Sequence, residues 1–221
     1  MAVSPQKKRR TAILISGRGS NMASLIEAAK AEDYPAEIAI VIANRPDAAG
    51  IDFAKTAGIS THIVDHKKFE DRESFEAELT RAIESANADL VCLAGFMRLL
   101  TPEFVGHWHD RLINIHPSLL PAFKGLDSHA RAIAAGVRIA GCSVHYVRAE
   151  MDAGPIIAQA AVPVKGDDTA DTLAARVLKA EHKLYPQALA LVASGRARAV
   201  GEKVVIDGEE VEEAILFAPD C

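Results

Sequence analysis

The distribution of hydrophobic and polar residues along the first half of the chain predicts strands that alternate with helices. Short apolar runs occur at residues 11–15, 38–43, 61–64, 90–94 and 112–116. The clearest of these runs are continuous rather than alternating, which is typical of strands buried on both faces of a parallel sheet.

Helical spacing fills the segments between these runs, at residues 22–31, 48–57 and 71–86. In the last segment Phe75, Leu79 and Ile83 recur every four residues, so they share one face of a helix. The alternation predicts an α/β fold with a mostly parallel, doubly wound, Rossmann-like sheet and helices on both of its faces.

The pattern changes after Pro117 and predicts an antiparallel C-terminal extension. We expect a helix, two strands and a long second helix, at residues 128–135, 141–147, 156–164 and 169–194. Pro186 should kink or split the long helix. A closing strand at 200–206 with a hairpin turn at Asp207-Gly208 precedes an acidic stretch, 209–213. We expect one domain, residues 1–221, with lobes at 11–105 and 106–221.

Composition narrows the class of protein. The chain has 221 residues, a net charge of −5 and 49% hydrophobic residues, which fits a globular enzyme and argues against a general nucleic-acid binder. No apolar run approaches the roughly 20 residues of a membrane span. The basic start, Lys7-Lys8-Arg9-Arg10, leads into too short an apolar run for a signal peptide. Cys92, Cys142 and Cys221 form no C-x-x-C pair, so we expect reduced thiols and a cytoplasmic location.

A glycine-rich segment, Gly17-Arg18-Gly19-Ser20-Asn21, joins the first predicted strand to the first predicted helix. Backbone N–H groups at such a helix start bind anions, and Ser20 or Asn21 could cap the helix. The third glycine of a dinucleotide fingerprint is absent, and no Walker A lysine follows. Monophosphate binding and a tight turn without a ligand both remain open at this stage.

An amide, an imidazole and a carboxylate form the second candidate site. Asn114 and His116 lie two residues apart on a predicted strand, so they project from the same face. Together such groups can stabilise a developing oxyanion and move a proton, which suits chemistry at a carbonyl. Asp152, in an Asp-Ala-Gly turn, would favour the charged imidazole if it lay beside it. His145 could join them or be a polar residue of the core.

Histidines also bind metals, but their spacing here predicts no metal site. His107-Trp108-His109 is the one H-x-H pair, and neighbouring side chains diverge in such a segment. The sequence contains neither H-E-x-x-H nor C-x-x-C. We therefore expect chemistry carried by the protein's own side chains.

Taken together, five motifs resemble the glycinamide ribonucleotide formyltransferase family of folate-dependent enzymes. The resemblance runs from about residue 13 to 195, and its order and spacing are highly specific. The motifs are Leu14-Ile15-Ser16-Gly17-Arg18-Gly19-Ser20-Asn21, Leu93-Ala94-Gly95-Phe96-Met97-Arg98-Leu99-Leu100, Ile113-Asn114-Ile115-His116-Pro117-Ser118-Leu119-Leu120-Pro121, Ser143-Val144-His145-Tyr146-Val147 and Asp152-Ala153-Gly154-Pro155.

The resemblance implies transfer of a formyl group from 10-formyltetrahydrofolate to the amino group of 5′-phosphoribosylglycinamide, in de novo purine biosynthesis. Asn114 and protonated His116 would donate to the oxyanion, and Asp152 would keep His116 charged and take the amine proton through water. The resemblance assigns the substrate to Gly19, Ser20, Asn21 and Glu181. It assigns the folate to Arg72, Met97, Arg98, Leu99, Leu100, Asn114, Val147, Arg148, Ala149, Glu150, Met151 and Asp152.

By the same resemblance, residues 11–105 are the phosphate-binding lobe and residues 106–221 the folate and catalytic lobe. Both partners are small molecules, with no metal, nucleic acid or membrane, and a homodimer is compatible with the sequence. The rivals are formyltetrahydrofolate hydrolase, which uses water as acceptor, and a non-catalytic nucleotide- or folate-binding module. Methionyl-tRNA formyltransferase would need a further domain and a basic surface. A dehydrogenase is disfavoured by Ala43-Asn44-Arg45, where a ribose-binding acid is expected.

Overall fold

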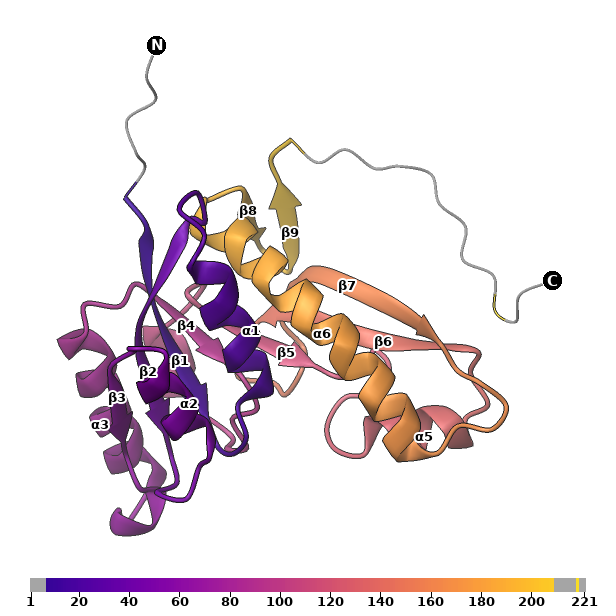
Figure 1. Cartoon of the computed structure of the whole chain (residues 1–221), viewed down its shortest axis with the longest axis horizontal. Coiled ribbons are helices and arrows are strands. Elements are labelled where there is room, and N and C mark those ends of the chain that lie inside the picture. Colours follow the sequence, from indigo (N-terminus) through magenta and orange to yellow (C-terminus); the bar gives the residue numbers. More distant parts are fainter. Residues whose placement is uncertain (1–6, 209–217, 219–221) are drawn as a thin grey trace.

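The computed structural model describes residues 7–208 and residue 218 (Figure 1). Its centre is a seven-stranded sheet with the order β3-β2-β1-β4-β5-β6-β7. Neighbouring strands from β3 to β5 are parallel, and β6 and β7 run antiparallel. The strands are β1 (Arg9–Ile15), β2 (Ala36–Ala43), β3 (Thr61–Ile63), β4 (Leu90–Leu93), β5 (Leu112–His116), β6 (Ile139–Tyr146) and β7 (Ile156–Pro163).

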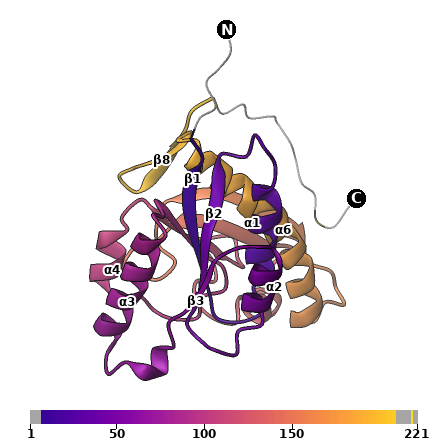
Figure 2. The ribbon, with the colours of Figure 1, turned by 60° about the vertical axis from the view of Figure 1, so that its left-hand side comes forward.

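Helices cover both faces of this sheet, as Figure 2 shows for α3 and α4 on one side and α1, α2 and α6 on the other. The first pair is α3 (Arg72–Ser85) and α4 (Pro102–His107). The other face carries α1 (Ser20–Ala29), α2 (Gly50–Thr56), α5 (Ser128–Ala134) and α6 (Ala170–Ala193). A short 3₁₀ turn, η1 (His66–Lys68), follows β3. The predicted fold class, a doubly wound α/β sheet, is confirmed.

Strand β1 explains why the apolar runs are continuous. Ile13 and Ile15 pack into the core beneath α1 and α6, whereas Ala12 and Leu14 pack into the core beneath α3. Successive side chains of a strand point to opposite faces, so a strand buried on both sides needs an apolar residue at every position. Cys92 and Cys142 lie in such strands and are buried free thiols, as expected.

Pro186 was expected to kink or split the long helix, and the split is wrong, because α6 continues through Pro186. A proline inside a helix costs about 3 kcal/mol. The helix offsets this cost by burying Leu184, Tyr185 and Leu189 against the sheet. The carbonyl of Pro186 also accepts a hydrogen bond of 2.7 Å from the Tyr34 hydroxyl.

The predicted closing strand, 200–206, is interrupted. Residues 197–206 form a separate two-stranded antiparallel sheet of β8 (Ala197–Val200) and β9 (Lys203–Ile206), which reverses at residues 201–202. Asp207 and Gly208 lie in a turn, as predicted, and Arg198 pairs with Asp207 at 2.7 Å. The acidic stretch at 209–213 lies outside the described residues. Among the helices of the described part, none is long and apolar enough to cross a bilayer.

Candidate active site

The imidazole of His116 and the carboxylate of Asp152 meet at the end of strand β5. His116 Nδ1 lies 3.3 Å from Asp152 Oδ2, and both side chains are largely buried. Strand β5 delivers His116 to the carboxyl edge of the sheet, and the turn after β6 brings Asp152 back over it. The predicted pairing of these two residues is therefore present.

Both ring nitrogens of His116 face acceptors. Nδ1 faces the Asp152 carboxylate, and Nε2 lies 3.1 Å from the backbone carbonyl oxygen of Phe123. A neutral imidazole carries only one N–H, whereas the charged ring carries two. The surroundings of His116 thus suit the imidazolium, a group able to donate to an oxyanion.

Asp152 is held by its backbone as well as by its partners. Its φ of 51° lies in the left-handed region, which aspartate tolerates better than most residues. The backbone N–H of Gly125 donates to Asp152 Oδ2 at 2.9 Å. Two residues later the turn passes so close to β6 that a Cβ at Gly154 would overlap the Tyr146 carbonyl oxygen. Glycine at position 154 lets the turn aim the carboxylate at His116.

His145 joins the cluster through Asn114. The two residues pair across β5 and β6, and Asn114 Nδ2 lies 3.3 Å from His145 Nε2. His145 Nδ1 lies 2.9 Å from the carbonyl of Tyr146, which can only accept, so Nδ1 carries the hydrogen and Nε2 accepts from Asn114. Burial lowers the pKa of His145 and keeps it neutral. The 3.8 Å approach of Asp152 Oδ1 to this neutral ring is therefore not an ion pair.

The glycine-rich segment lines a cavity of about 510 Å³. The segments that follow β1, β2, β3 and β4 contribute Ser16, Gly17, Arg18, Gly19, Ser20, Asn21, Asn44, Arg45, His66, Ala94, Gly95, Met97 and Arg98. The chain leaves β1 for β2 on one side and reaches β4 on the other, so the cavity lies at the switch point where open α/β sheets bind ligands.

Helix α1 begins beside this cavity with its first N–H groups free of any side-chain cap. Its N-cap residue is Gly19, so the expected capping by Ser20 or Asn21 is wrong. Both residues lie within the first turn, and the Asn21 amide instead donates to Glu181 Oε2 at 2.6 Å. Uncapped N–H groups at a helix start leave room for an anion.

Glu181 links the cavity to the His116 cluster. Only 6% of Glu181 is exposed. Burial raises the pKa of its carboxyl, whereas the hydrogen bond from Asn21 and the nearby His116 oppose that rise. Asn21 Oδ1 has no partner among the described residues. A buried polar atom of this kind is usually hydrogen-bonded, so Asn21 Oδ1 is open to a further partner.

Most of the residues expected at the folate site lie in two loops, 97–100 and 147–152, whereas Arg72 begins α3 and Asn114 lies in β5. Met97 and Leu99 are 74% and 66% exposed, and Met151 is half exposed, so large apolar side chains face solvent here. The Arg148 side chain is directed elsewhere, because it pairs with Asp110 at 2.8 Å, which leaves its backbone for a ligand.

Arg72 begins α3, one turn before the buried Glu76. Glu76 accepts a hydrogen bond of 3.0 Å from the backbone N–H of Thr101, which ties α3 to the end of the loop holding Met97 and Leu99. This hydrogen bond therefore holds the loop of Met97 and Leu99 in a fixed position relative to Arg72, at the start of α3.

The histidines of the H-x-H pair diverge. His107 Nε2 lies 3.1 Å from Glu84, and His109 Nε2 lies 3.6 Å from Asp110. Within residues 7–208 and 218, no group of three or more His, Cys, Asp or Glu side chains is arranged to hold a metal ion.

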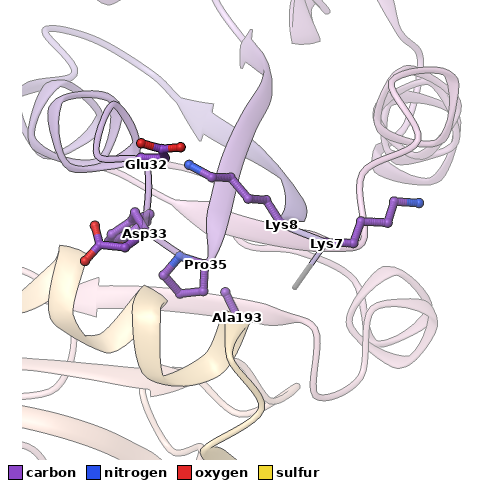
Figure 3. Close-up of a pocket in the computed structure, with 7 residues that line it drawn as sticks. Lys7, Lys8, Glu32, Asp33, Pro35 and Ala193 are labelled. Carbon is purple, nitrogen blue, oxygen red and sulfur yellow. The ribbon is translucent and has the colours of Figure 1, made fainter. Parts of the chain in front are cut away.

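A second cavity, of about 480 Å³, lies at the opposite edge of the sheet, where β1 and β2 begin (Figure 3). Lys7, Lys8, Glu32 and Asp33 line it, and Lys8 Nζ donates to the carbonyl of Ala31 at 2.8 Å. Its charges are mixed in sign, and it is separated by the length of the strands from His116.

The formyl transferase family model matches residues 9–189 of this chain, which span the glycine loop, the His116 cluster and Glu181. The chain belongs to the formyl transferase family. The resemblance expected from the sequence is therefore confirmed, and with it the class of enzyme, a formyltransferase.

Individual proteins of known name are also similar to this chain. The phosphoribosylglycinamide formyltransferase of Escherichia coli is 42% identical over 90% of this chain and 94% of its own length. Trifunctional purine biosynthetic protein adenosine-3 of Bos taurus is 50% identical over 87% of this chain, which spans only 19% of that larger protein. A solved glycinamide ribonucleotide transformylase from Symbiobacterium toebii superposes with a TM-score of 0.88 at 42% identity, covering 90% of this chain and 94% of its own.

The rival activity also has a relative in this family. A formyltetrahydrofolate deformylase from Pseudomonas syringae superposes with a TM-score of 0.84 at 29% identity, over 92% of this chain and 67% of its own. Both activities therefore occur on this fold, so the fold alone does not tell whether the formyl group is transferred to an amine or to water. The residues of the site must make that distinction.

Two features of the site were missed from the sequence. The Phe123 carbonyl contacts His116, and His66 and Asn44 line the cavity. A signal existed for Asn44, because it directly follows an apolar strand whose carboxyl end faces the site. His66 lies in a short 3₁₀ turn that the apolar pattern did not indicate.

Proposed function

We propose that this protein transfers the formyl group of 10-formyltetrahydrofolate to the amino group of 5′-phosphoribosylglycinamide, as a cytoplasmic step of purine biosynthesis. The observation that carries the proposal is one cluster, Asn114, His116 and Asp152, placed beside a cavity with an uncapped helix start. The cluster suits reaction at a carbonyl carbon, and the helix start suits a phosphate.

The amine attacks the formyl carbon and a tetrahedral oxyanion forms. His116 donates from Nε2 to this oxygen once the oxygen takes the place of the Phe123 carbonyl, 3.1 Å away in this structure. Asn114 adds the amide hydrogen that His145 does not use. One such donor is worth roughly 3–4 kcal/mol of transition-state stabilisation.

Asp152 has two roles in the reaction, since it stabilises the charged imidazole and removes the amine proton. Its Oδ2, 3.3 Å from His116 Nδ1, stabilises the charged imidazole that donates to the oxyanion. Asp152 also accepts the amine proton, through water, as the C–N bond forms. The tetrahedral intermediate then breaks its bond to the folate nitrogen, and that nitrogen receives, through water, the proton that Asp152 accepted from the amine. General acid–base help of this kind contributes about 10²–10⁴-fold.

Binding places the two substrates for this attack. Backbone N–H groups of Gly19, Ser20 and Asn21 hold the phosphate, and Glu181 accepts from ribose or glycinamide groups while it is itself held by Asn21. The folate occupies the exposed apolar surface of Met97, Leu99 and Met151. Arg72, Arg98, Leu100, Val147, Arg148, Ala149 and Glu150 complete the proposed folate site, with the 147–152 backbone around the pterin.

Formyl release from 10-formyltetrahydrofolate, measured with and without 5′-phosphoribosylglycinamide, tests the proposal. We expect turnover only in the presence of the amine, with formylated amine as product. Formate released at the same rate without the amine would contradict the transferase and identify water as the acceptor. That outcome would support the second candidate function, hydrolysis, which is the activity named for the solved deformylase of similar fold.

A further inference from the structure

We propose that His66 is a phosphate-binding residue of the substrate cavity, and that Asn44 holds its ring in the binding orientation. The inference rests on the proposed function, since it names a residue of the same substrate site. His66 comes from η1, after β3, so it adds a wall to the cavity that neither the glycine loop nor the His116 cluster supplies.

The tautomer of His66 follows from one hydrogen bond. Its Nδ1 lies 2.7 Å from the backbone carbonyl oxygen of Asn44, an atom that can only accept, so Nδ1 carries a hydrogen. The side-chain Nδ2 of Asn44, 3.5 Å away, is also a donor and cannot share that contact productively. Nδ1 is thereby committed to the protein, and Nε2 is the nitrogen available to a ligand.

The ring is fixed on a second side. Phe75 of α3 meets it edge-on, with ring centroids 6.4 Å apart and an interplanar angle of 76°. Such an edge contact adds orientation to the hydrogen bond with Asn44. A histidine held from two sides and lining a cavity is pre-organised for a ligand, in contrast to a freely rotating surface histidine.

Asn44 supplies an independent sign that a ligand enters here. It lines the cavity, only 1% of it is exposed, and its Oδ1 has no partner among the described residues. Buried polar atoms are nearly always hydrogen-bonded, by protein, water or ligand. The unpartnered oxygen therefore points to a group that completes this wall when substrate is bound.

The charges around the cavity favour an anion with His66 as a donor. Arg18, Arg45 and Arg98 line the cavity, and Arg45 is already paired with Asp47 at 2.6 Å. Asp65 and Lys67 flank His66 in the chain, and the Asp65 carboxylate accepts a hydrogen bond from the Lys67 backbone N–H at 3.1 Å. In its charged form His66 donates from Nε2 to a phosphate oxygen, a charge-assisted hydrogen bond.

The test compares the phosphorylated substrate with its dephosphorylated counterpart, ribosylglycinamide. We expect His66→Ala to raise the KM for the phosphorylated substrate about tenfold to a hundredfold, with kcat and the KM for the formyl donor nearly unchanged. Activity with ribosylglycinamide should be unaffected. His66→Gln, whose amide reaches toward the position of Nε2, should recover part of the loss. His62→Ala, at an exposed histidine of β3, is the matched control.

An equal loss with both substrates would overturn the inference, because it would mean that His66 supports the fold rather than the phosphate. Calorimetric binding of ribose 5-phosphate separates this inference from the proposed function. Weaker binding in His66→Ala than in His62→Ala supports the phosphate role even if the wild-type protein transfers no formyl group. Equal binding of ribose 5-phosphate by both variants, with formyl transfer intact, would reject His66 and leave the proposed function standing.

Discussion

The side-chain amide of Asn114 donates to Nε2 of His145 at 3.3 Å, which leaves one of its two amide hydrogens for a substrate. His145 can accept because its other nitrogen is bound to the Tyr146 carbonyl and burial lowers its pKa. A buried neutral histidine thus orients the proposed oxyanion donor without itself touching the reacting atoms.

The first prediction concerns this orientation. His145→Ala should lower kcat by about tenfold to a hundredfold and leave the KM for the phosphorylated substrate nearly unchanged, because only the aim of Asn114 is lost. The measurement is a double-mutant cycle in which His145→Ala is added to Asn114→Ala. If His145 acts through Asn114, the second substitution adds little. Fully additive losses would show that His145 acts separately.

The second prediction concerns the carboxylate beside His116. Asp152→Asn removes the charge but keeps a residue type that tolerates the left-handed backbone at position 152. Turnover should fall at least about a hundredfold, and so should that of His116→Ala, while binding of the phosphorylated substrate persists. Steady-state kinetics with calorimetry of the phosphorylated substrate check this. Turnover near wild type in either variant would remove the assigned roles.

The third prediction concerns the start of α1. Substitution of Ser20 or Asn21 should raise the KM for the phosphorylated substrate more than the KM for the formyl donor, because these residues lie by the proposed phosphate position. Asn21→Ala should be the more damaging change, since it also removes the 2.6 Å hydrogen bond to Glu181. Initial-rate measurements with each substrate varied in turn check the ranking. Equal changes in both KM values would contradict the phosphate assignment.

The fourth prediction concerns the buried carboxyl of Glu181. Burial raises its pKa in the folded state, so its contribution to stability is greatest at low pH and is lost as the pH rises through the raised pKa. Glu181→Gln removes the buried charge and retains an acceptor for Asn21. The variant should therefore gain stability relative to wild type as the pH rises, while its KM for the phosphorylated substrate increases.

Urea unfolding of wild type and Glu181→Gln across pH 5–8 measures the difference, with Glu150→Gln at an exposed carboxylate as the control. A stability difference that shrinks as the pH rises would contradict the burial of a charged Glu181. An unchanged KM would leave the stability argument intact and remove Glu181 from the substrate site.

Part of the candidate site could be predicted from the local sequence pattern. Spacing by two on an apolar strand placed Asn114 and His116 on one face, because alternation along a strand does not depend on the rest of the fold. For Glu181 the resemblance alone implied a substrate contact, although the residue lies four residues after Val177 and three before Leu184, on the buried face of α6. The helical spacing therefore also indicated that this polar residue lies on an apolar face.

Other features needed the folded chain. The length of α6 across Pro186 depended on burial of Leu184, Tyr185 and Leu189 against the sheet, which offsets the cost of the proline. The interruption of the predicted strand 200–206 at residues 201–202 depended on the pairing of Lys203–Ile206 with Ala197–Val200. In both cases a local propensity was overridden by contacts between residues that the local pattern does not connect.

By itself the sequence determined the doubly wound sheet, the family and the residue types of the chemistry, since periodicity and motif order are properties of the chain. Tertiary structure alone decided that Asp152 lies 3.3 Å from His116, that Asn114 is aimed by His145, and that His66 lines the same cavity as the glycine loop. The reason is physical: strand ends far apart in sequence converge at one sheet edge, and distances across that edge are set by the packing of the whole core.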